Sequence, residues 1–314
     1  MRPDSRLRPV LTLCLGVFVF FTQDLVIKFV AGAYPVHEVI LIRCLASLPF
    51  LAPLIARSGG LRTILSPRAK FLALRGLVLL GAYTAYYLAF PVMKLADILA
   101  LYASVPLFIA ALARPLLGER IGVRGWASVG IGFLGALVMV QPGTGVFAPT
   151  SLLPVAAALC YALSAVLARK FAPTETAPAM AFYQTVVFIA AALLFALLIG
   201  WARPVAPENR ALAFLLRGWA TPSWRDLALM ALCGPVSAAG MTLLSQAYRI
   251  ARQANQIAAF EYTGLLWASF YGYTIWGEVP GAASFLGAAL IVGGGLVLLT
   301  GPAPARTRPA PDSV

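Results

Sequence analysis

Long apolar runs, each close to the roughly 20 residues that a helix needs to cross the hydrocarbon of a bilayer, fill most of this sequence. Glycine, proline and charged residues separate one run from the next. With 61% hydrophobic and 11% charged residues, the chain has too little polar surface to cover a water-soluble globule of 314 residues. We therefore predict an all-α integral membrane protein with ten transmembrane helices. The predicted spans lie near residues 10–31, 37–56, 71–92, 95–113, 123–141, 151–169, 178–200, 226–247, 253–275 and 281–300.

Basic residues are dense in every second loop between these spans, and this alternation predicts the orientation of the chain. The net charge of +13 is spread between apolar runs without a groove-reading motif, so it does not indicate nucleic-acid binding. Lys and Arg accumulate instead in the cytoplasmic loops of inner-membrane proteins. We expect a multi-pass protein of the cell inner membrane with both termini in the cytoplasm. The basic loops hold Arg2, Arg6, Arg8, Arg57, Arg62, Arg68, Lys70, Arg114, Arg120, Arg124, Arg169, Lys170, Arg249, Arg252, Arg306 and Arg308.

The sequence offers little of the chemistry that enzymes and metal sites need. Its 11 acidic residues are scattered singly, whereas a membrane-embedded enzyme for a lipid or prenyl substrate usually needs clustered carboxylates that hold a metal. The four cysteines lack paired spacing, and no GxxxxGK[ST] loop for ATP is present. No helix shows the full polar stripe of a channel. We expect no cofactor and no metal, and we favour a secondary transporter over an enzyme or a channel.

Two stretches of the chain repeat one pattern of landmark residues at a constant separation of 159 positions. Each half then holds five spans, an odd number, so the second half must enter the membrane from the opposite side, as in the inverted repeats of secondary transporters. We place the first repeat at residues 1–145 and the second at 146–302, and we expect residues 303–314 to be a disordered cytoplasmic tail. The paired landmarks are Ile98 and Ile257, Gly118–Glu119 and Gly277–Glu278, and Gly135 and Gly294.

These landmarks make the chain similar to the drug/metabolite transporter superfamily, in the ten-helix form built from two five-helix EamA repeats. The resemblance covers nearly the whole chain and rests on the two Gly-Glu turns, the glycine-spaced helix after each turn, and Pro106. The segments TQDLVIKF, HEVILIR and Leu74–Gly76 resemble a branch that includes bacterial riboflavin and S-adenosylmethionine importers. Many members carry Glu-Pro where this chain has Gly264 and Leu265, so the role of that acid does not pass directly to Glu261.

The resemblance implies that the protein carries a small-molecule metabolite through the lipid bilayer by alternating access. Riboflavin uptake is the first expectation, because of the branch and because tyrosines that could stack on a planar ring are numerous. Uptake of S-adenosylmethionine and efflux of amino acids or related metabolites are the alternatives. The sequence leaves the direction of transport and the coupling ion open.

Four charged residues in the first two spans are candidates for a coupling or substrate site, because a charge inside hydrocarbon is costly unless it is paired or hydrated. Asp24 and Lys28 lie four residues apart and share a helix face. A hairpin turn near residue 33 brings Lys28 to the depth of Glu38, and Asp24 to the depth of Arg43. The sequence thus predicts two stacked ion pairs, which either take part in transport or only hold the hairpin together.

Two more charges lie inside predicted spans. Glu261 has no charged neighbour in sequence, and hydrocarbon favours the neutral form of a carboxylic acid, which suits proton coupling. A substrate contact and a hydrogen-bonded structural role are the alternatives for Glu261. Arg75 lies about one turn from the edge of its span, so a structural or lipid-anchoring role competes with a substrate contact.

Aromatic and amide side chains gather on the helices that line the central cavity in the resembled fold. They could stack on or hydrogen-bond a planar substrate, although tyrosines in membrane helices are more often interfacial anchors or packing residues. These candidates are Tyr83, Tyr86, Tyr87, Tyr102, Tyr161 and Gln184.

The last span of each predicted repeat is rich in glycine. Small residues let helices approach closely in membranes. We therefore assign these two helices to scaffolding or to the contacts of a homodimer, and not to the substrate path. The glycines are Gly130, Gly132 and Gly135 in one span, and Gly287, Gly293, Gly294 and Gly295 in the other.

Overall fold

The computed structural model describes residues 4–30, 34–89, 92–93, 95–119, 121–143, 149–202, 215–277, 279 and 281–299. Within these residues every regular element is a helix, and no strand occurs. The tail predicted at 303–314 lies outside the described residues. The helices are α1 (Asp4–Val30), α2 (Val36–Arg57), η1 (Gly60–Thr63), α3 (Ala69–Ala89), α4 (Leu95–Tyr102), α5 (Val105–Leu117), α6 (Val123–Val140), η3 (Pro149–Ser151), α7 (Leu152–Phe171), α8 (Ala177–Ala202), α10 (Trp224–Ile250), α11 (Asn255–Ala258), η4 (Ala259–Tyr262), α12 (Thr263–Trp276) and α13 (Ala282–Leu299), where η marks a 3-10 helix.

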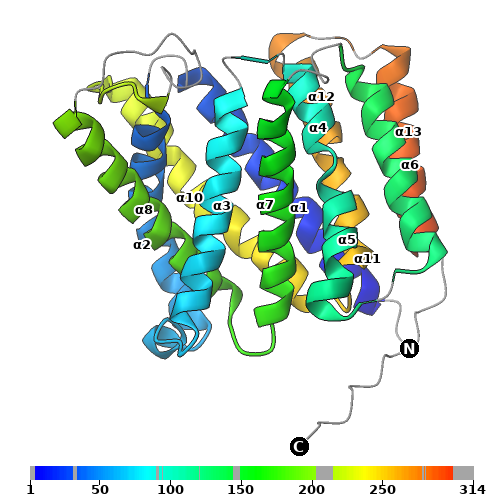
Figure 1. The fold of residues 1–314 in the computed structure, drawn as a ribbon, viewed down its shortest axis with the longest axis horizontal. Coiled ribbons are helices and arrows are strands. Elements are labelled where there is room, and N and C mark those ends of the chain that lie inside the picture. The colour runs from blue at the N-terminus through cyan, green and yellow to red at the C-terminus, as the bar shows by residue number, and fades with distance from the viewer. Residues whose placement is uncertain are drawn as a thin grey trace, which may run out of the picture.

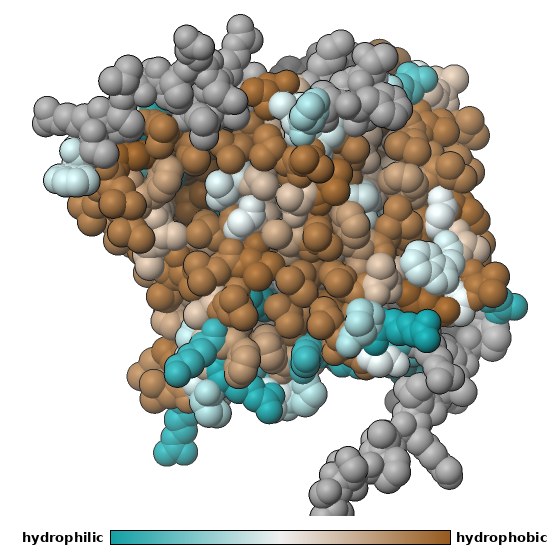
Figure 2. All heavy atoms as spheres, in the orientation of Figure 1, coloured by the Kyte–Doolittle hydropathy of each residue, from teal (hydrophilic) through white to brown (hydrophobic). Residues whose placement is uncertain are grey.

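The surface of the bundle is suited to lipid. Among the described residues, seven helical segments between Val36 and Ile250 are long and apolar enough to cross a membrane, and shorter apolar helices lie at Leu7–Gln23 and Ala282–Val297. Hydrophobic residues cover most of the face seen in Figure 2, and hydrophilic residues gather at its lower end. The prediction of an all-helical, multi-pass membrane protein is therefore confirmed at this level.

The helices lie side by side in an elongated bundle (Figure 1). α6 and α13 pair at one end, and α2 and α8 pair at the other. Between them, α1 packs against α10, and α3 packs against α7. The centre of the bundle is therefore built from early and late parts of the chain together.

Glycine permits the close contact between α6 and α13. A Cβ atom on Gly135 would lie 2.8 Å from the carbonyl oxygen of Gly287, and one on Gly294 would lie 2.8 Å from the carbonyl oxygen of Ser128. The Ser128 hydroxyl donates a hydrogen bond to the carbonyl of Gly294, at 2.6 Å. These glycines are used within one chain, as the scaffolding role predicts, and their contacts give no support to a homodimer.

The fourth and ninth predicted spans, 95–113 and 253–275, each contain a break in the regular α-helix. α4 ends at Tyr102 and α5 begins at Val105. Pro106 explains this break, because proline has no N–H to donate to the carbonyl of Tyr102 four residues earlier. In the ninth, the 3-10 helix η4 separates α11 from α12, and the Thr263 hydroxyl donates to the carbonyl of Phe260 at 2.7 Å. Both breaks lie beside the cavity described next.

Candidate functional site

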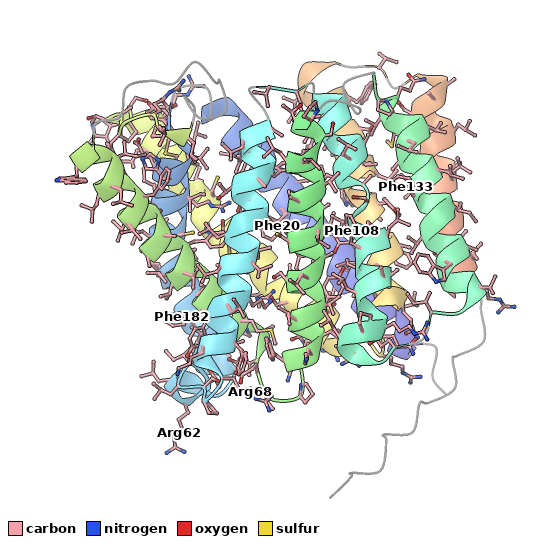
Figure 3. The ribbon with its side chains drawn as sticks, in the orientation of Figure 1. Phe20, Arg62, Arg68, Phe108, Phe133 and Phe182 are labelled. Atoms are coloured by element: carbon pink, nitrogen blue, oxygen red, sulfur yellow. The ribbon has the colours of Figure 1, made fainter. Side chains whose placement is uncertain are left out.

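A cavity of about 140 Å³ lies inside the bundle, between α1, α3, α4, α7, α10 and the η4–α12 segment. Phe20 of α1 is one of its lining residues, and Figure 3 places Phe20 at mid-height in the bundle, far from Arg62 and Arg68 at the lower end. Most of the lining is aromatic or aliphatic, and Glu261 is the charged residue among the lining side chains. Its aromatic lining consists of Phe20, Phe21, Tyr83, Tyr86, Tyr87, Tyr102, Tyr161 and Tyr262.

The predicted tyrosine cluster forms one wall of this cavity. Tyr83, Tyr86 and Tyr87 are three and four residues apart, so they lie on one face of α3. The ring of Tyr86 lies 4.9 Å from that of Tyr102, and the ring of Tyr102 lies 6.1 Å from that of Tyr161. These separations are typical of interacting aromatic pairs. The structure thus brings five predicted candidates to the same cavity, namely Tyr83, Tyr86, Tyr87, Tyr102 and Tyr161.

Glu261 reaches the cavity from η4, the 3-10 segment in the ninth predicted span. The Tyr248 hydroxyl donates to Oε1 of Glu261 at 2.6 Å. The Tyr161 hydroxyl lies 3.3 Å from Oε1 and 3.4 Å from Oε2 of the same carboxyl group. Two phenol groups therefore hold this acid in place, Tyr248 through a short hydrogen bond and Tyr161 through longer ones.

A second, smaller cavity of about 30 Å³ contains Arg75. The Arg75 side chain is 5% exposed and points into the bundle, so the lipid-anchoring alternative for this residue does not agree with the structure. Its Nε donates to the carbonyl of Ser164 at 3.0 Å, and its Nη2 donates to the hydroxyl of Ser245 at 3.3 Å. Both acceptors are neutral. Gln184, the remaining predicted candidate of the cluster, lines this cavity and not the larger one.

Arg43 is fully buried in α2. Among the described residues, none of its three guanidinium nitrogens has a hydrogen-bond partner, and its Cζ lies 5.2 Å from the centroid of the Tyr83 ring. The side chains of Asp24 and Lys28 lie outside the described residues. The predicted pairing of Asp24 with Arg43, and that of Lys28 with Glu38, therefore stay predictions.

Glu38 is also fully buried, and it joins two separated parts of the chain. Its Oε2 accepts a hydrogen bond from the backbone N–H of Ala220 at 3.0 Å. This contact fastens the start of α2 to the segment that precedes α10. It gives Glu38 a structural task that the sequence did not reveal.

Tyr248 is the functional candidate that sequence analysis missed. It lies at the end of α10, where a tyrosine is easily taken for an interfacial anchor. In the structure it is 2% exposed and bonded to Glu261, thirteen residues further on. The sequence offered one signal for this contact, which is that Tyr248 lies close in sequence to the lone acid Glu261. The turn at residues 252–254 separates the two helical segments that carry them.

Comparisons with known proteins agree with this architecture. A crystal structure that is 20% identical superposes with a TM-score of 0.74, covering 92% of this chain and 96% of the other, which supports the fold alone. The chain is 26% identical over 286 residues to the S-adenosylmethionine uptake transporter of Rickettsia felis, covering 91% of this chain and 90% of the relative. It is 29% identical to the riboflavin transporter of Rhizobium johnstonii, covering 68% of this chain and 64% of the relative.

A third relative is named as an exporter. The chain is 27% identical to the pseudopaline exporter CntI of Pseudomonas aeruginosa, covering 90% of this chain and 93% of the relative. These relatives are named as transporters and not as enzymes. Residues 7–141 match the EamA-like transporter family. Residues 7–141 therefore resemble an EamA domain, and most of the chain is similar to proteins named as transporters.

Proposed function

We propose that this protein is a secondary transporter that moves a small organic metabolite across the inner membrane by alternating access. The substrate site is the tyrosine-lined cavity around Glu261. The observation that carries this proposal is a buried carboxyl group, held by two phenols, at a cavity in the middle of an apolar bundle. Ionisable groups at such positions mark substrate or proton pathways in membrane proteins.

The volume of the cavity limits what it can hold in this conformation. Its 140 Å³ is close to the roughly 150 Å³ that holds a benzene molecule in an engineered protein cavity. Pockets for drug-sized ligands occupy about 300–1,000 Å³. One ring of a substrate fits in this conformation, and the rest of a larger metabolite requires the two halves to move apart.

We further propose ten spans in two inverted repeats, at residues 1–145 and 146–302. In these repeats α1 corresponds to α7, and α3 corresponds to α10. The helix packing supports this relation, because α1 packs against α10 and, equivalently, α7 packs against α3. In addition, α2 packs against its counterpart α8, and α6 packs against its counterpart α13. This is the contact pattern of two units related by a twofold axis.

Individual residues support the same relation. Gly135 approaches Gly287, and Gly294 approaches Ser128. The two contacts are equivalent under the repeat, because Gly294 lies 159 positions after Gly135 and Ser128 lies 159 positions before Gly287. Gly118 and Gly277, also 159 apart, have φ angles of +69° and +67°. Left-handed backbone at both positions explains why glycine stands at each Gly-Glu turn.

For orientation, we propose that both termini lie in the cytoplasm. Support comes from basic residues that meet at one end of the bundle. Arg68 donates to the Thr174 hydroxyl at 2.7 Å, Arg249 donates to the Glu175 carbonyl at 2.9 Å, and Arg169 donates to the Arg252 carbonyl at 2.6 Å. These loops are distant in sequence, and the positive-inside rule assigns their shared end to the cytoplasm.

The lining of the cavity and the names of the relatives support a substrate that carries a planar ring. Riboflavin and S-adenosylmethionine both carry planar rings that could stack among Tyr83, Tyr86 and Tyr102. Riboflavin uptake was the first expectation from the sequence. The carboxyl group of Glu261 adds a second possibility of recognition, because it can accept hydrogen bonds from a positively charged substrate or carry a proton during the transport cycle.

The experiment is uptake of labelled riboflavin, S-adenosylmethionine and a mixture of amino acids into proteoliposomes that contain the purified protein, with and without a proton gradient. At least one compound should enter faster than into protein-free liposomes. Glu261→Gln should reduce that uptake at least about tenfold. Glu175→Gln is the matched control, because Glu175 is a buried acid outside the cavity whose Oε1 accepts from Ser66, and glutamine retains this acceptor. Equal loss in both variants, or no uptake of any compound, would contradict the proposed function.

A further inference from the structure

The two cavities described above share a wall. Phe20, Tyr83, Tyr161 and Leu244 line both of them. The larger cavity contains an acidic side chain, Glu261, and the smaller one contains a basic side chain, Arg75. The acidic and basic groups therefore stand on two sides of one layer of side chains.

Tyr161 and Tyr248 form the layer between the two charges. Their hydroxyl groups bond to Glu261, and both side chains also line the cavity of Arg75. Among the described side chains, no carboxylate lies within 4 Å of the Arg75 guanidinium. The two groups thus share neighbours, and among the described residues the hydrogen bonds of each go to neutral groups.

Such an arrangement leaves the acidic and the basic group without an opposite charge among the described side chains, and a ligand could supply both. A buried charge is stabilised most by an opposite charge with good hydrogen-bond geometry. The planar guanidinium of Arg75 matches a carboxylate, which it can bind through two parallel N–H groups. The carboxylate of Glu261 matches an ammonium group, and the surrounding tyrosine rings also attract cations.

We propose that the two cavities together bind a zwitterionic head group, with its ammonium at Glu261 and its carboxylate at Arg75. An aromatic or other planar part of the same molecule lies among Tyr83, Tyr86 and Tyr102. The proposal rests on the proposed transport function and narrows its substrate to the chemical class of α-amino acids with a ring. It disfavours riboflavin, which has neither charge.

The size of the smaller cavity agrees with its assigned ligand group. A water molecule needs about 10–15 Å³ by this measure. The 30 Å³ beside Arg75 therefore has room for about two water-sized atoms, and a carboxylate has two oxygens. The side chain of Leu244 lies in the wall that the two spaces share.

The first arm of the experiment compares matched ligands by thermal stabilisation of the purified, full-length protein. Phenylalanine, phenethylamine and 3-phenylpropionate have the same ring. Phenylalanine carries both charges, phenethylamine carries only the positive charge, and 3-phenylpropionate carries only the negative charge. S-adenosylmethionine and its decarboxylated form make a second pair, and riboflavin is the neutral probe. Because a ligand that binds the folded state raises its stability, the midpoint of unfolding reports binding. In at least one of these two sets, the compound with both an ammonium and a carboxylate should bind at least about tenfold more tightly than the analogues that lack one of these groups.

The second arm assigns each charge to its residue. Arg75→Gln should remove the preference for the zwitterion over the amine and leave its preference over the acid. Glu261→Gln should do the reverse. Arg75→Lys retains the charge without the planar fork, so it should give an intermediate preference, and it also serves if Arg75→Gln does not fold.

Three outcomes overturn the inference. These are binding of the singly charged members as tightly as the zwitterion, stabilisation by no zwitterion in the panel, and unchanged preferences in the Arg75 variants. If one of these outcomes is found and riboflavin still enters proteoliposomes, the transport function stands and only the zwitterion assignment is removed. Absence of uptake of every compound would instead remove the transport function itself.

Discussion

The hydroxyl of Tyr248 lies 2.6 Å from Oε1 of Glu261 and joins the end of α10 to the 3-10 segment that follows it. The Tyr161 hydroxyl approaches the same carboxyl group at 3.3 and 3.4 Å. The two phenols therefore differ in how strongly they hold one acid, because hydrogen-bond strength falls as the distance grows.

This difference predicts unequal effects of two equivalent substitutions. Tyr248→Phe should lower the free energy of unfolding by about 1.5–3 kcal/mol, as expected for a short bond to a carboxylate. Tyr161→Phe should cost less, about 0.5–1.5 kcal/mol, because its bond is long. Thermal unfolding in detergent would measure both variants. A larger loss in Tyr161→Phe would contradict this ranking.

The glycine contact between α6 and α13 predicts a sharp contrast between neighbouring positions. A Cβ atom on Gly294 would meet the carbonyl oxygen of Ser128 at 2.8 Å, whereas one on Gly293 would meet nothing within 4 Å. Gly294→Ala should therefore destabilise the protein by about 1–3 kcal/mol, because the backbone must move. Gly293→Ala should be neutral or stabilising by about 0.5–1 kcal/mol through helix propensity. Equal unfolding midpoints for the two variants would argue against the close packing.

The Gly-Glu turn after α5 predicts a purely conformational effect. Gly118 has a φ of +69° and open space where a Cβ would lie. Gly118→Ala should cost about 1–2 kcal/mol because an L-residue is strained in the left-handed region. Gly130→Ala is the control, since Gly130 lies within α6, has open space and has no positive φ. The unfolding midpoint should fall for Gly118→Ala alone.

Several parts of this architecture could be predicted from the sequence because they depend on local patterns. The apolar runs located the helices, since crossing hydrocarbon requires a fixed length of helix. The spacing of Tyr83, Tyr86 and Tyr87 placed three phenols on one face of α3. Local spacing, however, does not determine how a helix is rotated about its axis within a bundle. Arg75 shows this, because its position near the edge of a span suggested lipid contact, yet it points inward.

The central hydrogen bonds could not be predicted because they join distant parts of the chain. Tyr161 and Glu261 are 100 residues apart and meet only when α7 packs beside η4. The break between α4 and α5 was more accessible, since Pro106 stands in the expected span. The break at Glu261 has no such residue, and its 3-10 backbone depends on the packing around it.

Arg43 supports the last prediction, which concerns its partner. A buried guanidinium strongly destabilises a protein if its only opposite charge is removed, while removal of both charges costs less than the sum. The sequence names Asp24 as this partner, and the structure places Tyr83 at 5.2 Å. Two double-mutant cycles on unfolding separate these contributions, one with Asp24→Asn and Arg43→Gln, and one with Tyr83→Leu and Arg43→Gln.

The two cycles should give different coupling energies. An ion pair between Asp24 and Arg43 predicts a coupling of about 3 kcal/mol or more, because each single variant leaves an uncompensated buried charge. The contact between Arg43 and the Tyr83 ring predicts only about 0.5–2 kcal/mol. Additive effects of Asp24→Asn and Arg43→Gln would show that the two residues do not pair. Arg43 would then be a second buried cation beside the tyrosine wall, held chiefly by aromatic rings.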